Sequence, residues 1–366
     1  MDPVTRPVNV VIRTAKPDSA TSATAIAPRS LTKMPTGGPL VDTFGRIHTD
    51  LRLSVTDRCN LRCVYCLPEE GVVFRPREEI LSFEEIARVA RLARGLGVTA
   101  VRITGGEPLI RRNVVELVRQ VAEIGFEDLS LTTNGTSLSR LAKPLAAAGL
   151  LRLNVSCDSL RPERYASIRR RGDLDEVLTG MDAAEEAGLL PLKVNVVLVG
   201  GVNDDEVLDF AAFARATGRT VRFIEFMPLD ADGAWQRGAV VPSDDVLARI
   251  SSEYPLAAID PERLDPAPAD TYRFSDGSKG AVAVVASVTR PFCGTCNRLR
   301  LTADGAIRNC LFSDNEVTIR DSMRAGASDE EIALAIRRSV WGKLPGHGIN
   351  DPGFLRPARS MSMIGG

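Results

Sequence analysis

Three cysteines within eight residues constrain this chain more than any other feature of its sequence. Cys59, Cys63 and Cys66 have the spacing C-x3-C-x2-C, so their thiolates can bind one metal centre together. A tetrahedral zinc site would need a fourth ligand nearby, but the loop has no histidine and the chain has only two, His48 and His347. We therefore interpret the loop as the site of an iron–sulfur cluster that leaves one iron open. A structural zinc knuckle is the alternative.

With Tyr65 directly before its last cysteine, this loop resembles the signature of the radical S-adenosylmethionine (SAM) superfamily. The resemblance implies a 4Fe–4S cluster whose open iron binds the amino and carboxylate groups of SAM. Reductive cleavage of SAM then gives a 5′-deoxyadenosyl radical. The superfamily's SAM-contact pattern matches Tyr65, Gly105, Gly106, Glu107, Ser156 and Met227.

Composition excludes several classes of function. The 366 residues carry 46 basic and 47 acidic side chains, a balance that argues against bulk affinity for nucleic acid. No apolar run reaches the roughly 18 residues of a membrane span, and the N-terminus lacks the apolar core of a signal peptide. Six of the seven cysteines fall into two triplets, which is metal-binding usage in a reducing compartment. We expect a cytoplasmic protein without a membrane partner, and we interpret the seventh cysteine, Cys157, as a buried thiol.

The chain divides into three parts by its patterning. Residues 1–38 are rich in Pro, Thr, Ala and Ser and are predicted to be a disordered N-terminal extension, with a transit peptide as the alternative. Residues 39–230 alternate strand and helix patterns, which predicts a parallel sheet and a partial (β/α)6 TIM-like barrel of the α/β class. Residues 231–366 lose this regularity and are predicted to form an α+β domain that carries a second cluster.

Local signals give the expected elements. Barrel strands are expected at 51–55, 100–104, 128–131, 153–156, 192–198 and 221–227, so that Ser156 and Met227 end two of them. Capping boxes at Ser82–Glu85, Asn203–Glu206 and Ser328–Glu331 predict helix starts. The second of these helices is expected to carry the hydrophobic residues Val207, Leu208, Ala211 and Phe213. Further predictions are a helix near 244–250, a strand at 281–288, and a hairpin of 298–301 with 306–308.

A second triplet consists of Cys293, Cys296 and Cys310, again without a nearby fourth ligand. Residues two apart on a strand point to the same side, so Arg298 and Arg300 should face one way beside this centre. Because Arg binds phosphate through paired hydrogen bonds, this arrangement indicates an anionic ligand. A zinc ribbon and a solvated basic face are the alternatives.

Three charges stand in predicted barrel strands: Arg52, Arg102 and Lys193. Buried charges rarely lack a partner, and a triphosphate would be one. The alternative is that Arg102 or Lys193 pairs with a barrel carboxylate such as Glu225.

The run Cys-Gly-Thr-Cys-Asn-Arg-Leu-Arg-Leu at 293–301, with Cys310, resembles the GTP 3′,8-cyclase family, also called molybdenum cofactor biosynthesis protein A. The run Leu-Arg-Leu-Ser-Val-Thr-Asp-Arg-Cys at 51–59 and the terminal Gly365-Gly366 fit as well, so the resemblance extends from about Phe44 to the end. It implies cyclisation of GTP to (8S)-3′,8-cyclo-7,8-dihydroguanosine 5′-triphosphate, the first step of molybdenum cofactor biosynthesis. The radical would take hydrogen from the ribose C3′, and the carbon radical would attack C8 of guanine.

The same resemblance implies roles for residues and partners. A second 4Fe–4S cluster on Cys293, Cys296 and Cys310 would hold the guanine through its open iron. The GTP contacts would be Arg52, Arg102, Thr132, Lys193, Arg298, Leu299 and Arg300, and the catalytic residues Arg52, Arg298, Arg300, Gly365 and Gly366. An external electron donor and a downstream cyclic pyranopterin monophosphate synthase would be partners, with a homodimer as one option for assembly. The alternatives are another radical SAM enzyme with an auxiliary cluster, such as a peptide-modifying one, and a non-catalytic metal protein.

Overall fold

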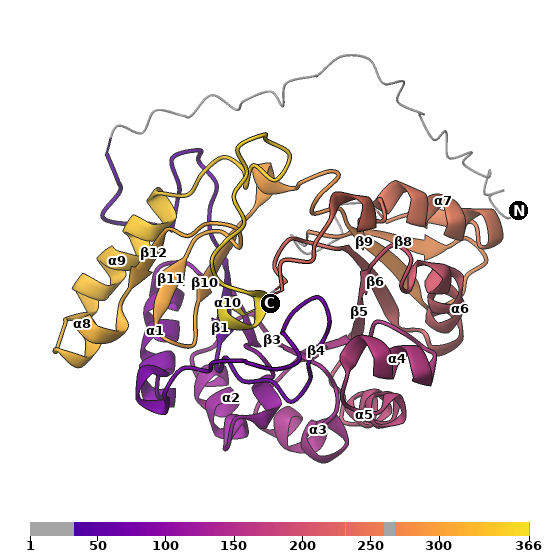
Figure 1. Ribbon diagram of the computed structural model, residues 1–366. Coiled ribbons are helices and arrows are strands. Elements are labelled where there is room, and N and C mark those ends of the chain that lie inside the picture. Colours follow the sequence, from indigo (N-terminus) through magenta and orange to yellow (C-terminus); the bar gives the residue numbers. More distant parts are fainter. Residues whose placement is uncertain (1–32, 231, 260–267, 366) are drawn as a thin grey trace, which may run out of the picture.

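The computed structural model describes residues 33–230, 232–259 and 268–365 (Figure 1). The predicted disordered extension therefore lies outside the described residues up to residue 32. All seven cysteines are described, and all have free thiols. In the described parts of the chain, no helix has the length and apolar character needed to cross a membrane.

Six parallel strands and their crossover helices form the main part of the fold, as the sequence predicts. The strands are β1 (Asp50–Ser54), β2 (Ala100–Thr104), β3 (Asp128–Thr133), β4 (Arg152–Ser156), β5 (Lys193–Leu198) and β6 (Thr220–Glu225). The helices are α1 (Phe83–Gly95), α2 (Val114–Ala122), α3 (Leu138–Ala147), α4 (Pro162–Arg169), α5 (Leu174–Glu186) and α6 (Val207–Thr217). Figure 1 shows these helices on the outside of a curled sheet, which is the predicted partial barrel.

Strands from the C-terminal part of the chain extend this sheet at both edges. β10 (Arg298–Leu301) pairs in parallel with β1, and the predicted hairpin joins it to β11 (Ala306–Arg308), followed by β12 (Glu316–Thr318). At the other edge β9 (Ala281–Val285) pairs in parallel with β6, and β8 (Asp270–Phe274) and β7 (Leu256–Ala258) follow it. The result is one twelve-stranded sheet. The division near residue 230 stays a prediction. Among its described residues, the segment after it forms no sheet of its own.

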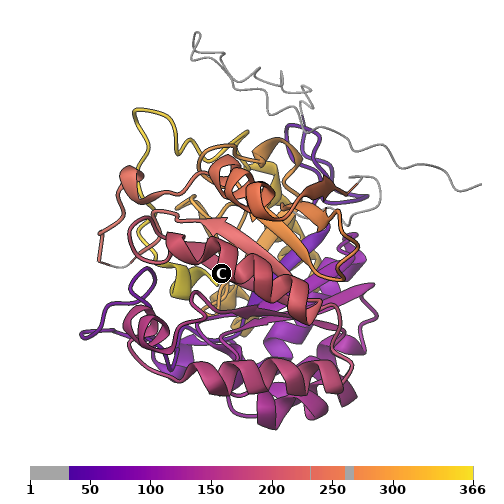
Figure 2. The same cartoon turned by 90° about the vertical axis from the view of Figure 1, so that its right-hand side faces the viewer.

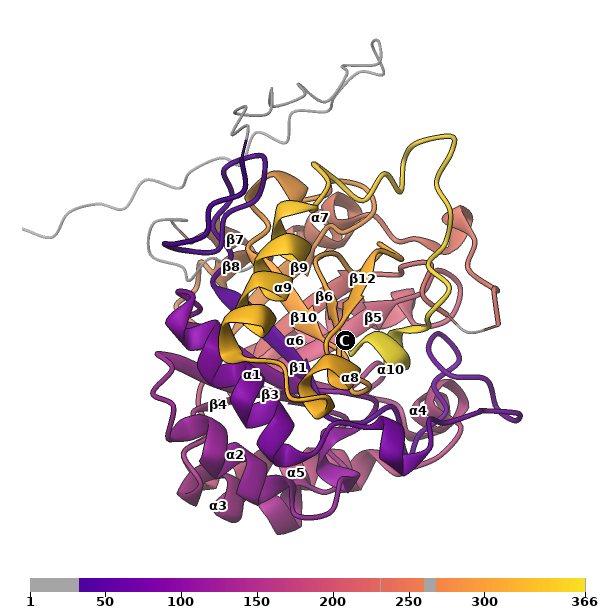
Figure 3. The same ribbon diagram turned by 90° about the vertical axis from the view of Figure 1, so that its left-hand side faces the viewer.

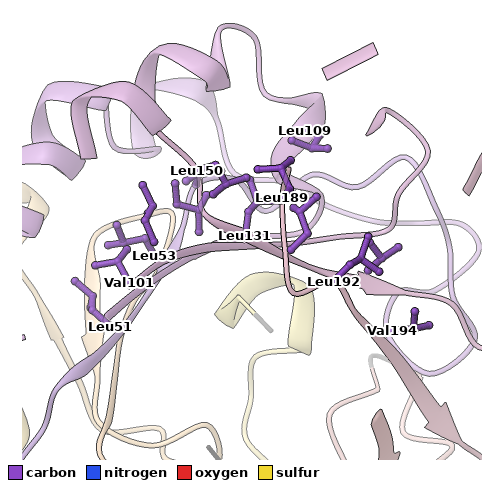
Figure 4. Close-up of a cluster of buried hydrophobic side chains, with 14 of the residues drawn as sticks. Leu51, Leu53, Val101, Leu109, Leu131, Leu150, Leu189, Leu192 and Val194 are labelled. Carbon is purple, nitrogen blue, oxygen red and sulfur yellow. The ribbon is translucent and has the colours of Figure 1, made fainter. Parts of the chain in front are cut away.

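Alternating side chains give each barrel strand an apolar outer face and a polar inner face. Leu51 and Leu53 of β1 and Val101 of β2 are fully buried in the main hydrophobic core, while Arg52 and Arg102 alternate with them. Figure 4 shows part of this apolar layer, including Leu131 and Val194. Burial of each leucine stabilises the fold by about 1.5–3 kcal/mol. The outer layer can therefore hold a barrel whose inner face is built from charged and polar groups.

Three of the remaining described helices lie over the outer parts of the sheet, and the short helix near the C-terminus lies near the centre of the molecule. These helices are α7 (Ser243–Glu253), α8 (Arg320–Arg324), α9 (Asp329–Trp341) and α10 (Met361–Ile364), with short 3-10 turns at Arg77–Glu79, Pro108–Ile110, Asp204–Glu206, Arg237–Ala239 and Cys293–Thr295. Figure 3 shows α9 beside α1, against which it packs. The capping boxes predicted for these two helices are confirmed. Two perpendicular views, Figures 1 and 2, both show the described part of the C-terminal tail running to the centre of the molecule.

Three local predictions were wrong. Asn203 does not cap α6: its amide hydrogen-bonds the backbone at Val199, Val197 and Asp158, and a 3-10 turn precedes the helix. The buried face of α6 consists of Val207, Phe210, Ala211 and Ala214, whereas Leu208 is exposed and Phe213 half-buried. The sixth strand ends at Glu225, so Met227 lies two residues beyond it.

Candidate active site

A cavity of about 310 Å³ lies at the carboxyl ends of the parallel strands, where chemistry is found in barrels of this kind. All six triplet cysteines line it: Cys59, Cys63 and Cys66 on one loop, and Cys293, Cys296 and Cys310 from the C-terminal part. Cys157 does not line it and is fully buried in the core, as predicted. Among the described residues, no group of three or more His, Cys, Asp or Glu side chains is arranged to hold a single metal ion.

The first cysteine loop follows β1 and is fixed by the Gly-Gly turn that follows β2. The Gly106 amide donates to the Thr56 carbonyl at 2.7 Å, and the Glu107 amide donates to the Arg58 carbonyl at 2.8 Å. A Cβ on either glycine would collide with the backbone of residues 56–58. The two glycines are therefore required for the close approach of this turn to the cysteine loop.

Glu107 joins the ends of β2 and β3. Its buried carboxylate accepts hydrogen bonds from the Leu109 amide at 2.9 Å, the Thr133 hydroxyl at 2.8 Å and the Asn134 amide at 2.6 Å. Burial outweighs these bonds and raises the pKa of Glu107 to about 7. The Glu107 carboxyl group thus lies in the cavity wall with a pKa close to neutral pH.

The second cysteine triplet is held by residues that sequence reasoning missed. Arg46, anchored on Asp42, donates to the carbonyls of Cys293 at 2.7 Å, Pro345 at 3.0 Å and Leu344 at 2.6 Å. Lys343 donates from Nζ to Cys296 Sγ at 3.3 Å. Although burial opposes it, the charges of Arg298 and Lys343 lower the pKa of Cys296 to about 6. This thiol is therefore largely a thiolate at neutral pH.

Arginines on neighbouring strands form a row of positive charge along the cavity. Strand register puts Arg52 of β1 between Arg102 of β2 and Arg300 of β10. Arg222 of β6 and Arg298 of β10 also line the cavity. Burial, followed by repulsion from neighbouring arginines, lowers the pKa of Arg300 to about 9 and that of Arg222 to about 9. Such crowded cations favour an anionic ligand.

Not every predicted contact lines the cavity. Thr132, Ser156, Tyr65 and Met227 do, together with the residues described above. Leu299 does not, because on β10 it alternates with the arginines and packs in the hydrophobic core. Lys193 starts β5 on the same face as Asn195 but lies outside the cavity lining.

The alternative pairing of Arg102 with Glu225 is not observed. The Glu225 carboxylate accepts hydrogen bonds from Ser243, Val288 and Thr289, and Arg102 donates to Ser130 at 3.2 Å. Sequence reasoning also missed Arg222. The argument that was used for Arg102, that a charge in a barrel strand needs a partner, could have found it.

The C-terminal tail lies between the two triplets. The backbone of Ser362 lies close to Cys66, and the Gly365 carbonyl accepts from Arg300 Nη1 at 2.5 Å. Gly365 has a φ of +87°, and a Cβ there would lie 2.6 Å from the Ser54 Cβ. Gly366 lies outside the described residues. A residue without a side chain is thus needed at 365 for the tail to reach the arginine row.

The chemistry of the cavity fits the implied ligands. Each triplet supplies three thiols, the donor set of an iron–sulfur cluster with one open iron. Five buried polar atoms of the wall have no hydrogen-bond partner among the described residues: Arg52 Nε, Asn195 Oδ1, Ser287 Oγ, and Nε and Nη2 of Arg169. Buried polar atoms without partners are costly, which fits a polar ligand that would satisfy them.

Two family models together cover most of the chain. The model of the Radical SAM superfamily matches residues 53–214, and that of Molybdenum Cofactor Synthesis C matches residues 219–349. Among solved structures, anSMEcpe with bound AdoMet has a TM-score of 0.54 at 13% identity, covering 82% of this chain and 79% of that one. SuiB of Streptococcus suis bound to S-adenosylmethionine has a TM-score of 0.53 at 14% identity, covering 78% and 64%. At such low identity these likenesses concern the fold alone.

Curated relatives match at much higher identity. The GTP 3′,8-cyclase of Streptomyces coelicolor is 49% identical over 89% of this chain and 96% of its own length. That of Rhodopirellula baltica is 47% identical over 89% and 92%. The GTP 3′,8-cyclase 2 of Mycobacterium tuberculosis is 48% identical over 91% and 94%. Together with the cysteine-lined cavity and the two matching family models, these relatives show that the chain belongs to the GTP 3′,8-cyclase family of the radical SAM superfamily.

Proposed function

We propose that this chain cyclises GTP to (8S)-3′,8-cyclo-7,8-dihydroguanosine 5′-triphosphate, the first step of molybdenum cofactor biosynthesis. The observation that carries the proposal is one cavity lined by both cysteine triplets and by the arginines of β1, β2, β6 and β10. A site for the radical chemistry of SAM and a site for a polyanion are thereby adjacent. The identity of the relatives, near 48%, supports GTP as that polyanion.

In this proposal Cys59, Cys63 and Cys66 hold the first 4Fe–4S cluster. When bound there, the cluster and SAM supply a one-electron cleavage that yields methionine and a 5′-deoxyadenosyl radical. The cavity-facing side chains of Tyr65, Ser156 and Met227, with the Gly105–Glu107 turn, bind and orient SAM. Because that turn packs on the cysteine loop, the residues that contact SAM stay in a fixed position relative to the cysteines that hold the cluster.

The triphosphate is held by the arginine row. The single negative charge of the nearby Asp50 carboxylate cannot balance the positive charge of these arginines. They are Arg52, Arg102, Arg222, Arg298 and Arg300. A charge-assisted hydrogen bond from each arginine to a phosphate oxygen contributes about 1.5–3 kcal/mol. Thr132, Lys193 and the β10 strand around Leu299 complete the proposed contacts, Leu299 through its backbone.

Cys293, Cys296 and Cys310 hold a second 4Fe–4S cluster, which we propose binds the guanine. Arg46 and Lys343 fix the loops that carry these cysteines. The tail at Gly365 and Gly366 excludes water and orients the ribose for loss of the C3′ hydrogen, since misalignment of reacting atoms is costly to rate.

We also propose the wider setting of the reaction. An external one-electron donor reduces the first cluster, and the product passes to a cyclic pyranopterin monophosphate synthase. A cytoplasmic location agrees with seven free thiols. A homodimer is the assembly proposed for the chain.

The test is anaerobic reconstitution of the full chain with iron and sulfide, followed by incubation with GTP, SAM and dithionite. We expect about eight irons per chain, one 4Fe–4S cluster from each triplet, and equal amounts of 5′-deoxyadenosine and cyclised nucleotide. Cleavage of SAM without any cyclised nucleotide would contradict GTP as substrate. Replacement of GTP by a peptide library is the matched control for a peptide-modifying activity, and it should give no product.

A further inference from the structure

A buried arginine outside the arginine row contacts the first cysteine triplet. Arg169, the last residue of α4, is 3% exposed, and its Nη1 donates to Cys63 Sγ at 3.2 Å. Its Nη2 lies 2.7 Å from Asp158 Oδ2 as an ion pair, outside hydrogen-bonding geometry. Its Nε has no partner among the described residues. Within the described parts of the chain, the one directed hydrogen bond of this guanidinium therefore goes to a cysteine of the triplet.

Backbone contacts keep this arginine in place. The Arg169 carbonyl accepts from the Arg62 amide at 3.1 Å, and the Ile168 carbonyl accepts from the Val64 amide at 3.0 Å. The end of α4 and the cysteine loop are thus joined on both sides of Cys63. This pairing fixes the backbone of Arg169 next to the cysteine loop.

Asp158 balances the charge of Arg169 and is itself held firmly. It is 1% exposed, and it accepts hydrogen bonds from the Tyr65 hydroxyl at 2.6 Å and the Val197 amide at 2.9 Å. An arginine guanidinium stays protonated in proteins. The arginine is therefore a permanent cation next to the sulfur.

We propose that Arg169 is a positioning residue that raises the reduction potential of the first cluster, and that Asp158 moderates this effect. The proposal rests on the cluster that the radical SAM superfamily implies at Cys59, Cys63 and Cys66. Reduction adds one negative charge to a cluster, and a buried cation hydrogen-bonded to a ligating sulfur stabilises that charge. The nearby Asp158 carboxylate opposes the added electron. The same pair therefore sets how readily the cluster accepts the electron that cleaves SAM.

Removal of the two charges should move the potential in opposite directions. Arg169→Met should lower the reduced-to-oxidised ratio of the cluster at a fixed potential about tenfold, which is 59 mV for one electron. Asp158→Asn should raise that ratio, because it removes the opposing charge. Its amide oxygen can still accept from the Val197 amide, and its amide nitrogen can donate to the Tyr65 hydroxyl oxygen. Arg169→Lys keeps the charge and should stay near the value of the unmodified chain. Loss of structure alone would not produce shifts of opposite sign.

The measurement is an anaerobic redox titration of the reconstituted full chain, with and without SAM, followed by electron paramagnetic resonance. The signal that changes when SAM is added reports the first cluster. Arg170→Met is the matched control, because Arg170 pairs at 3.6 Å with the exposed Glu69, and it should leave the potential unchanged.

A fall or no change in Asp158→Asn would overturn the proposal. So would a shift in Arg169→Lys as large as that in Arg169→Met, whether or not cyclised nucleotide is formed. Absence of any SAM-responsive signal in the unmodified chain would instead contradict the radical SAM site itself. The two failures are therefore distinguishable.

Discussion

Substitution of Gly365 by alanine should displace the C-terminal tail from the arginine row. The residue has a φ of +87°, and its added Cβ would lie 2.6 Å from Ser54 Cβ and 3.3 Å from Thr104 Cγ2. The left-handed conformation costs a non-glycine residue about 1–2 kcal/mol. That cost is comparable with the roughly 1.5–3 kcal/mol of the hydrogen bond from Arg300 to the Gly365 carbonyl. A free-energy cost of about 1–2 kcal/mol reduces the population of molecules whose tail contacts Arg300 by roughly 5- to 30-fold.

The assay measures 5′-deoxyadenosine and cyclised nucleotide side by side for Gly365→Ala and the unmodified chain. We expect the nucleotide to fall in proportion to the seated tail, while SAM cleavage and both clusters persist. Gly353→Ala is the matched control, since a Cβ at this exposed position meets nothing within 4 Å. Product formation by Gly365→Ala at the unmodified rate would refute the reasoning that seats the tail through this residue.

Four further outcomes follow from the site. Removal of Gly365 and Gly366 should leave SAM binding intact but reduce cyclised nucleotide by orders of magnitude; unchanged turnover would mark the tail as dispensable. Cys63→Ser should abolish SAM cleavage, whereas Cys296→Ser should keep the first cluster and lose productive GTP binding, and intact turnover in the latter would contradict two clusters. Arg298→Ala should weaken GTP binding about tenfold or more in calorimetry without changing SAM affinity; equal loss of both would indicate misfolding. In metal-free protein, the rate of alkylation of Cys296 should be half-maximal near pH 6, because its pKa is about 6. Burial raises the pKa of Cys59 to about 12, so Cys59 should stay unreactive at pH 8. Identical pH profiles for the two cysteines would contradict this expectation.

Much of the barrel could be predicted because its signals are local. The strand at Ala100–Thr104 and the capping boxes of α1 and α9 each depend on a few adjacent residues. The hairpin around Asp304-Gly305 likewise needs only its own turn chemistry. Asn203 shows where this reasoning fails. The residue type suits a cap, but its side chain hydrogen-bonds three backbone groups instead, at Val197 in β5, at Val199 after it and at Asp158.

The supports of the site could not be predicted because their partners are distant in sequence. Arg46 lies 247 residues from the Cys293 carbonyl that it binds, and Arg169 lies 106 residues from Cys63. Neither stands in a motif, and an arginine near a helix end or in a loop is ordinary for a solvated surface. Only the fold shows that each one approaches a cysteine loop.

Strand order explains why the arginine row needs the whole chain. Arg52 of β1 is in register with Arg102 on one side only through β2, and with Arg300 on the other only through β10. β2 belongs to the segment before residue 230 and β10 to the segment after it. A chain that ended near residue 230 would lose Arg298, Arg300 and the second triplet, and would leave the edges of β1 and β6 unpaired. The arginine row therefore forms only when the strands from both parts of the chain join in one sheet. A substrate site built on this row exists only when the C-terminal strands have docked.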